Sequence, residues 1–322
     1  MTKVRLRIVD DATRAAFLRA EDLQAATRKN PELVLVGSTG KTPIATYARL
    51  GEIGADLSSI KLRMLDSYLS SPSRGFQAPE HRGSFTRYVI EKILEPLDQS
   101  RRPIDWVMPP EEITTCEQVF EELEAQVGRW ERPRHPMSGV EGSEFVLHDD
   151  VEGQLALVRR TCAAYDRLLE SAPIDIVMTG LGPLPYPHLA FNCGPYTRHE
   201  ALTHLALLDD ATRRANCADF DNDMENVPPL SITMGPRSVT RAMSIWITAT
   251  GSQKSTAVAH AFSDPRAEDF ELRSSIGYVL RSREVDLVFD EEAAEDLLAD
   301  GGFQGLEARY AEVGHELVAR RI

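Results

Sequence analysis

A short run of hydroxyl-bearing, small and basic residues follows the first stretch with β-strand character. The strand-like stretch covers Leu33 to Val36, and the run is Ser38-Thr39-Gly40-Lys41-Thr42-Pro43. Free backbone N–H groups and hydroxyls at the start of a helix bind anions, since the positive end of the helix dipole lies there. A Walker A loop would need glycine where Leu35 stands, so the run is not that motif. We expect Ser38, Thr39, Gly40, Lys41 and Thr42 to bind a phosphate ester. The alternative is that they form a turn that only caps the helix.

Two side chains that can transfer protons follow later strand-like runs. Asp66 ends the run Leu62 to Leu65, where a carboxylate can point into a cleft and act as a general base. His188 lies in a loop that three prolines stiffen, and a fixed imidazole relays protons near neutral pH. The alternatives are a capping role for Asp66 and a hydrogen-bonded structural role for His188.

Two further candidates are a lysine and a cysteine. Gly251-Ser252-Gln253-Lys254 opens a predicted helix after the run Ser244 to Thr248, which places the Lys254 ammonium where it could complete an anion site. A solvated helix lysine is the alternative. Cys193 has no obvious base assigned to it, which favours a small buried residue over a thiolate nucleophile.

These segments share a position in the predicted fold. Short β-branched runs alternate with amphipathic stretches of helical length, which is the pattern of βαβ units around a mostly parallel sheet. Ligands bind such sheets at the carboxyl ends of the strands, so we expect distant segments to converge on one cleft. The alternative is that every strand end needs turn residues. The other strand-like runs are Asp105 to Met108, Ile174 to Thr179, Leu230 to Met234 and Val285 to Phe289.

Residues 1–322 are expected to form a single domain, because large α/β enzymes reach this length as one unit. A helix is predicted over Phe85 to Leu94, another ends near Trp130 and a third begins near Asp150. Proline and glycine are frequent between the last two helices. Residues 131–149 are therefore expected to be a loop inserted at the surface.

The composition is that of a globular protein with an acidic surface. Hydrophobic residues make up 42% and charged residues 27%, and the formal net charge is −14. This field repels phosphate backbones and anionic lipid, so neither nucleic acid nor a membrane is expected as a partner. The four cysteines are widely spaced without a histidine cluster, which predicts reduced thiols and no metal. The lack of a signal peptide and of a long apolar segment predicts a cytoplasmic protein.

Together these segments resemble the glucosamine-6-phosphate deaminase and 6-phosphogluconolactonase family, and its deaminase branch in particular. The motifs that carry the resemblance are spread over most of the chain. They are Ser38-Thr39-Gly40-Lys41-Thr42-Pro43 with Thr46-Tyr47, Leu65-Asp66-Ser67-Tyr68, His81-Arg82-Gly83-Ser84-Phe85, Ile174 to Gly182, His188-Leu189-Ala190-Phe191-Asn192, Thr212-Arg213-Arg214-Ala215-Asn216, Val227 to Gly235 and Gly251 to Lys254.

The resemblance implies a modified Rossmann-like α/β/α sandwich that binds a phosphorylated sugar and uses no metal or organic cofactor. Asp66 would move the proton between C1 and C2, and His188 would assist ring opening. Relatives include monomers and closed oligomers, so a homo-oligomer is left open. The residues that would hold the phosphate and the sugar are Ser38, Thr39, Gly40, Lys41, Thr42, Gly180, Gly182 and Lys254.

The chain departs from the deaminases around the histidine. They have an aspartate two residues before it and a glutamate five residues after it, where this chain has Tyr186 and Cys193. The loop is also two residues longer than theirs. A phosphate-binding arginine of the deaminases is matched by Ala218, while Lys41 replaces a small residue and would return a positive charge. The residues expected to line a reshaped pocket are Ser67, Tyr186, Asn192 and Cys193.

Three functions follow from this pattern. The first is aldose–ketose isomerisation of a sugar phosphate or amino-sugar phosphate by carboxylate-mediated enolisation, with or without loss of the amine. The second is a non-catalytic sugar-phosphate sensor, which the missing carboxylates and arginine favour. The third is hydrolysis of a phosphosugar lactone, which the deaminase-like elements around Asp66 and Asn192 disfavour. We prefer an enzyme because Asp66, His188 and Lys254 are all present.

Overall fold

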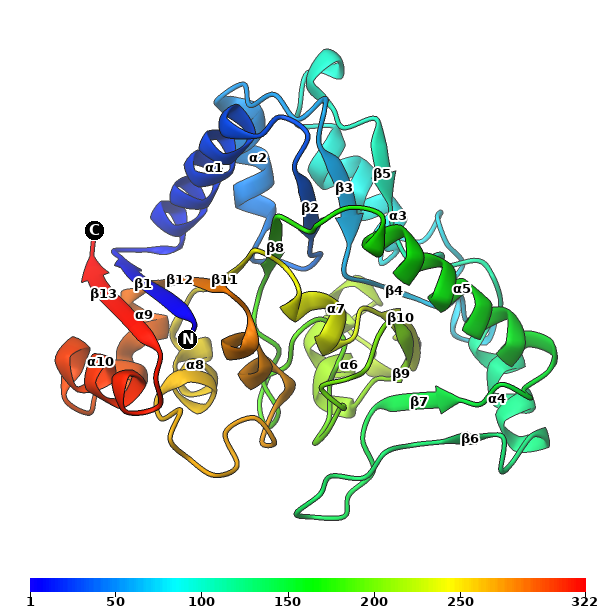
Figure 1. Cartoon of the computed structure of the whole chain (residues 1–322). Helices are drawn as coiled ribbons and strands as arrows, with labels where there is room; N and C mark the ends of the chain where they lie inside the picture. Colours follow the sequence, from blue (N-terminus) through cyan, green and yellow to red (C-terminus); the bar gives the residue numbers. More distant parts are fainter.

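The chain folds around two β-sheets, and the computed structural model describes all of residues 1–322. The larger sheet has the strand order β13-β1-β12-β11-β8-β2-β3-β5, and every neighbouring pair is parallel (Figure 1). Its strands are β1 (Lys3–Val9), β2 (Val34–Gly37), β3 (Lys61–Met64), β5 (Asp105–Val107), β8 (Ile176–Thr179), β11 (Ser244–Ala249), β12 (Glu284–Asp290) and β13 (Glu316–Arg321).

The smaller sheet is antiparallel and has the order β4-β10-β9-β7-β6. It lies beside the parallel sheet, at the end where β3 continues into β4 (Figure 1). Its strands are β4 (Asp66–Tyr68), β6 (Trp130–Glu131), β7 (Glu144–Leu147), β9 (His204–Leu207) and β10 (Leu230–Thr233).

Helices cover both faces of the larger sheet (Figure 1). One apolar core joins its strands to α1, α2 and the helix after residue 85, and another joins them to α8, α9 and α10. A third core packs α4 and α5 on the smaller sheet. The helices are α1 (Ala12–Lys29), α2 (Ile44–Glu52), α3 (Phe85–Tyr88) with a π-helical continuation (Val89–Leu94), α4 (Cys116–Ala125), α5 (Gly153–Glu170), α6 (Asp210–Asn216), α7 (Pro236–Thr240), α8 (Ser255–Phe262), α9 (Glu291–Leu298) and α10 (Gly302–Glu312).

The predicted parallel α/β sandwich is confirmed, and the antiparallel sheet is an addition that the sequence patterns do not predict. The run Leu230 to Met234, which the pattern places in the parallel set, forms β10 and pairs antiparallel with β4 and β9. A run of four residues carries no information about the direction of its neighbours, because long-range pairing decides it. The helix expected to end near Trp130 ends at Ala125, and Trp130 belongs to β6.

The segment predicted as an inserted loop is a β-hairpin. β6 pairs with β7, and β7 pairs in turn with β9, so the segment extends the smaller sheet by two strands. Within the hairpin the Gly142 N–H donates to the Pro133 carbonyl at 2.8 Å. The buried Glu144 accepts from the Arg198 guanidinium at 2.5 and 3.1 Å, which fixes the hairpin to the chain before β9. The prolines and glycines therefore mark the turn of a hairpin.

All four cysteines are unpaired, as predicted, and three of them are buried. Cys116 and Cys162 lie in the helices that cover the smaller sheet, and Cys193 lies in the chain after β8. Burial raises the pKa of each of these three thiols, so they stay protonated at neutral pH. None of the helices has both the length and the apolar character that a membrane span requires.

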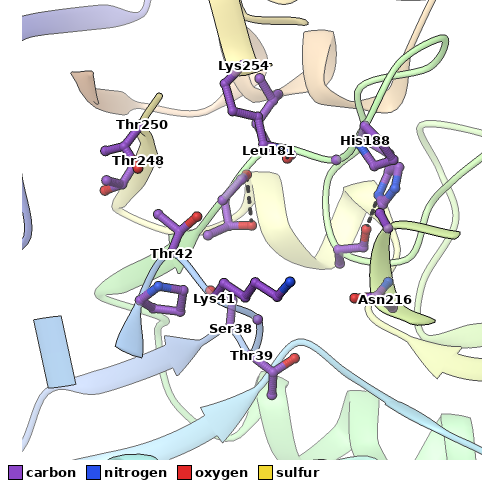
Figure 2. A pocket seen from close by; sticks show the side chains of 18 of the residues that line it. Ser38, Thr39, Lys41, Thr42, Leu181, His188, Asn216, Thr248, Thr250 and Lys254 are labelled. Atoms are coloured by element: carbon purple, nitrogen blue, oxygen red, sulfur yellow. Dashed lines mark hydrogen bonds between the residues drawn. The ribbon is translucent and has the colours of Figure 1, made fainter. Parts of the chain in front are cut away.

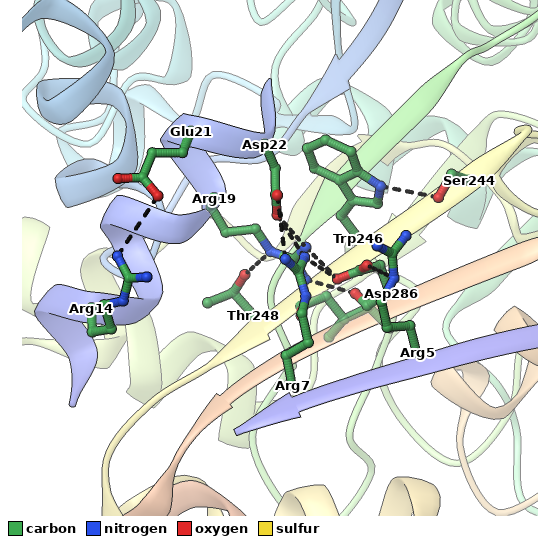
Figure 3. Close-up of polar contacts among 11 residues, drawn as sticks. Arg5, Arg7, Arg14, Arg19, Glu21, Asp22, Ser244, Trp246, Thr248 and Asp286 are labelled. Carbon is green, nitrogen blue, oxygen red and sulfur yellow. Dashed lines mark hydrogen bonds and ion pairs between the residues drawn. The ribbon is translucent and has the colours of Figure 1, made fainter. Parts of the chain in front are cut away.

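A buried carboxylate joins β12 to β1 and α1 (Figure 3). Asp286 of β12 accepts hydrogen bonds from Arg7 of β1 and Arg19 of α1, both at 2.6 Å, and pairs with Arg5 at 2.8 Å. Burial on its own would raise the pKa of Asp286, but Arg19 and Arg7 outweigh burial and hold the pKa below its ordinary value. Strand β1 has no equivalent among the predicted strands, although apolar residues alternate with these basic ones along it.

We expect Asp286→Asn to lower the free energy of unfolding by about 3–5 kcal/mol, because it leaves buried guanidinium groups without their counter-charge. Urea unfolding followed by circular dichroism measures the change. The matched control is Glu21→Gln, which removes the exposed 3.7 Å pair of Glu21 with Arg14. That variant should change stability by less than about 1 kcal/mol. Equal effects of the two substitutions would contradict the central role given to Asp286.

Candidate functional site

A cleft of about 810 Å³ lies at the carboxyl ends of the parallel strands. Its walls come from the segments after β2, β3, β8 and β11, together with the first turn of α1 and part of α6. Segments distant in sequence therefore converge, as the strand-end pattern predicts. The predicted site residues that line this cleft are Ser38, Thr39, Gly40, Lys41, Thr42, Asp66, Gly180, Gly182, His188 and Lys254.

The loop after β2 presents free backbone N–H groups. Residues 39–42 donate no backbone hydrogen bond within the protein. The Tyr47 hydroxyl donates to the Ser38 carbonyl at 2.9 Å, and the Tyr88 hydroxyl donates to the Gly40 carbonyl at 2.7 Å. In a planar trans peptide the next N–H points opposite to the carbonyl, so the tyrosines turn the N–H groups of Thr39 and Lys41 away from themselves. The loop precedes α2, and this arrangement fits a bound anion.

Two lysines enter the cleft from different elements. Figure 2 shows Lys41 extending from the loop after β2 and Lys254 entering from the opposite wall. The Lys254 ammonium donates to the Leu181 carbonyl at 2.6 Å, and its burial lowers its pKa. Two of its protons remain free for an anionic ligand, since an ammonium group has three donors. Lys41 is exposed.

Asp66 stands where the chain passes from one sheet to the other. β3 ends at Met64 and β4 begins at Asp66, and Leu65 between them bonds to both sheets, through the Gly37 carbonyl and the Met234 N–H. The Asp66 carboxyl is buried at the cleft. Burial raises its pKa to about 7, against a smaller opposite effect of the Phe191 N–H. A carboxyl with this pKa is suited to accept and return a proton at neutral pH.

His188 is held as a neutral imidazole. Its Nδ1 atom is hydrogen-bonded to the Ala190 carbonyl, and its Nε2 atom lies 3.0 Å from the Thr212 hydroxyl (Figure 2). Burial is the main reason that its pKa is lowered, and Lys254 adds to this, while the Ala190 carbonyl and Asp209 act in the opposite direction. A Cβ atom on Gly182 would lie 2.3 Å from the ring, so only glycine fits there. The glycine thus allows the loop to fold closely over the histidine.

Four residues expected to line the pocket do not reach the cleft. Ser67 is fully buried and points away, because side chains alternate across the strand that also carries Asp66. The Asn192 amide donates to the Leu189 and Met234 carbonyls at 2.7 and 2.8 Å, which gives it a structural role. Cys193 is buried with its thiol toward the Leu207 carbonyl, and Tyr186 is half-buried outside the cleft.

The cleft also contains residues to which the sequence analysis gives no role. Several carry hydroxyls, amides or a carboxylate, and they lie at the ends of β8 and β11, in the first turn of α1, on α6 and in the turn after α6. Thr212 and Asn216 belong to a motif that carries the family resemblance, so that motif was the available signal. No group of three or more His, Cys, Asp or Glu side chains is arranged to hold a metal ion. The polar additions to the lining are Thr13, Thr179, Thr212, Asn216, Asp219, Thr248, Thr250 and Gln253.

No family model matches the chain, but individual proteins do. The glucosamine-6-phosphate deaminase of Streptomyces coelicolor is 27% identical over 265 residues, which cover 81% of each chain. That of Exiguobacterium sibiricum is 26% identical over 304 residues, covering 94% of this chain and 96% of its own.

Solved structures share the fold. A monomeric glucosamine-6-phosphate deaminase gives a TM-score of 0.66 at 20% identity and covers 92% of this chain and 100% of its own. The 6-phosphogluconolactonase of Leishmania guyanensis gives a TM-score of 0.60 at 15% identity, over 92% and 98%.

The fold is that of an α/β enzyme with a cleft at the carboxyl edge of a parallel sheet. Over most of its length the chain is similar to glucosamine-6-phosphate deaminases, which agrees with the resemblance seen in its motifs. It shares its fold with a solved deaminase and with 6-phosphogluconolactonases.

We expect Asp66→Asn to stabilise the protein at alkaline pH. The carboxyl has a pKa of about 7 in the folded chain and an ordinary value of 3.8, so folding favours its protonated form. The protonated Asp66 carboxyl therefore contributes fully to the free energy of unfolding below pH 4, and this contribution is lost as the pH rises through 7. At pH 8 the variant should therefore exceed the wild type by on the order of 1–3 kcal/mol in urea unfolding.

The control for this measurement is Glu124→Gln, an exposed change on α4. It should leave the pH dependence of stability as it is in the wild type. An Asp66→Asn curve parallel to the wild type between pH 5 and pH 8 would show that the carboxyl titrates normally.

Proposed function

We propose that the chain catalyses proton transfer next to the carbonyl of a phosphorylated sugar or amino sugar, as in aldose–ketose isomerisation. The observation that carries the proposal is the shared cleft of a buried carboxyl, Asp66, with a pKa of about 7, and the unpartnered N–H groups of residues 39–42. The carboxyl is suited to act as a base, and the N–H groups are suited to bind a phosphate. The relatives named glucosamine-6-phosphate deaminase make a 2-amino sugar phosphate the first substrate to test.

The phosphate end of the substrate would lie against the loop after β2. The N–H groups of residues 39–42 and the Lys41 and Lys254 ammonium groups would bind its oxygens. These contacts hold the rest of the sugar across the cleft toward Asp66 and His188. Fixing one end in this way converts proton abstraction into a reaction within one complex.

Asp66 would then act as base and acid in turn. Ionised Asp66 removes the proton from C2, beside the aldehyde, and leaves an enediolate. The proton of the C2 hydroxyl or amine then moves to the former aldehyde oxygen, and Asp66 returns its own proton to C1. The net reaction exchanges the aldehyde and the ketone and consumes no proton. A pKa near the working pH favours both proton transfers, because Asp66 must be ionised for the first and protonated for the second.

Loss of an amine would be a further step beyond enolisation. It needs an acid close to the leaving nitrogen, and His188 is held neutral by its burial. Asp219 is the other carboxyl that lines the cleft. We therefore propose isomerisation as the primary reaction and treat release of ammonia as a separate outcome to be measured.

The test is proton exchange in D₂O with a panel of hexose and aminohexose 6-phosphates, followed by NMR while ammonia is assayed. We expect exchange at C1 or C2 with the wild type and a loss of about 10²–10⁴-fold with Asp66→Asn. Undiminished exchange in this variant would refute the assignment of the base.

The same panel separates the other functions. Ammonia release together with exchange would establish a deaminase. A thermal shift by one sugar phosphate without any chemical change would indicate a sensor, since ligand binding alone stabilises the fold. Hydrolysis of a phosphosugar lactone without exchange at C1 or C2 would indicate a lactonase.

We expect Lys254→Ala to weaken phosphate binding. Loss of a charge-assisted hydrogen bond is worth about 1.5–3 kcal/mol, which raises KM roughly 10- to 100-fold. Inhibition by inorganic phosphate should weaken in parallel. Lys29→Ala, an exposed change in the last turn of α1, serves as the control and should leave both constants unaltered. An unchanged KM for Lys254→Ala would place the phosphate elsewhere.

A further inference from the structure

The hydroxyl of Thr212 is hydrogen-bonded to Nε2 of His188, the histidine in the cleft. His188 Nδ1 is bonded to the Ala190 carbonyl, and a carbonyl oxygen only accepts, so Nδ1 must carry the proton. In the neutral ring Nε2 then has only a lone pair. Since Thr212 Oγ1 lies 3.0 Å from Nε2, the threonine hydroxyl must donate to the histidine.

The surrounding structure fixes this pair. The Asp209 carboxylate accepts the Thr212 N–H at 2.7 Å and the Gly194 N–H at 2.8 Å, which ties the start of α6 to the loop that follows His188. At the other end of the helix, the Asn216 amide donates to the Thr212 carbonyl at 2.9 Å. Thr212 is 1% exposed and still lines the cleft. Its position is thus set by backbone contacts that do not involve its hydroxyl.

The packing leaves a ligand little direct access to Nε2. The Gly182 backbone packs against the ring beside Nε2 and Cδ2, where a Cβ atom would come within 2.4 Å of either atom. Thr212 covers the lone pair itself. The Thr212 hydroxyl also lies beside the Cys193 thiol. Because its single proton goes to the histidine, its oxygen keeps lone pairs that can accept a hydrogen bond. A ligand hydroxyl in the cleft can donate to that oxygen.

We propose that Thr212 is a catalytic residue that relays a proton between the sugar ring and His188 during ring opening. This inference rests on the proposed function, because ring opening exposes the carbonyl beside which Asp66 would act. It assigns a chemical step to a residue on α6.

The step balances without any other reactant. The hydroxyl on the anomeric carbon gives its proton to Thr212 Oγ1 while the threonine's own proton passes to His188 Nε2. The new C1=O double bond forms as the bond from C1 to the ring oxygen breaks, and that bond's electron pair goes to the ring oxygen. The imidazolium then returns its proton through the same hydroxyl to the ring oxygen, which restores Thr212 and His188.

Anomer exchange of a bound sugar phosphate, measured by NMR saturation transfer between its α and β signals, tests the relay separately from enolisation. Wild type and Asp66→Asn should both accelerate this exchange, because it needs no proton transfer from carbon. Thr212→Val removes the hydroxyl from a side chain of similar shape and should slow the exchange by about 10²-fold or more. Thr212→Ser keeps the hydroxyl and should remain within about 10-fold of the wild type.

The pattern of results distinguishes the two proposals. Wild-type anomer exchange in Thr212→Val would overturn the relay while leaving enolisation by Asp66 intact. Absence of both anomer exchange and C1 or C2 exchange in the wild type, for every sugar of the panel, would overturn both proposals. Thr256→Val, an exposed change on α8, is the control and should behave as the wild type.

If Thr212→Val does not fold, the tautomer of His188 in the unmodified protein tests the relay. In protein labelled with ¹⁵N-histidine, His188 should show a protonated Nδ1 and an unprotonated Nε2 at pH 7.5, with its signals assigned from His188→Gln. The opposite tautomer, or an imidazolium, would overturn the relay because Thr212 could not then donate to Nε2.

Discussion

The Asp286 carboxylate is the interaction on which the arrangement of this molecule depends. It is the shared partner of arginines from β1 and α1, and it stands on β12 between β1 and β11. Arg19 extends the contact to β11, since its Nε donates to the Thr248 hydroxyl at 2.9 Å and its Nη2 to the Ile247 carbonyl at 2.8 Å. Because Thr248 lines the cleft, the charge network and the cleft wall are parts of one structure.

The same network determines where α1 begins. With Arg19 anchored over β12 and β11, the first turn of the helix reaches the cleft, where Ala12 and Thr13 form part of the wall. Buried charges of this kind are costly to leave unpaired, so the helix has one favourable position over the sheet. An ion cluster with no role in the chemistry thereby sets the width of the site at one end.

The site residues that lie in short motifs could be predicted from the sequence. Those whose position depends on long-range pairing could not. The residues after β2, Asp66, His188 and Lys254 could be predicted because strand ends with unusual residues meet at one edge of a parallel sheet. Strand β1 was not predicted because arginines are typical of the protein surface. Their pairing with Asp286, which allows them to lie in the sheet, is not visible in the sequence. Ser67 was misplaced because nothing in the sequence shows that the chain changes sheets at Leu65. The motif around Thr212 was visible in the sequence, but its contact with His188 was not. That contact depends on the approach of α6 to a loop that precedes it by more than twenty residues, which no local pattern encodes.

The three buried thiols can report local opening of the protein. Thiol reagents attack an exposed thiolate, so each cysteine reacts only when its surroundings open transiently. Cys193 follows the loop of His188, whereas Cys116 and Cys162 belong to the helices that cover the antiparallel sheet. Their labelling rates compare the transient opening of the His188 loop with that of the helix layer. A ligand that orders the loop would protect Cys193 and leave the rates of the other two as they were.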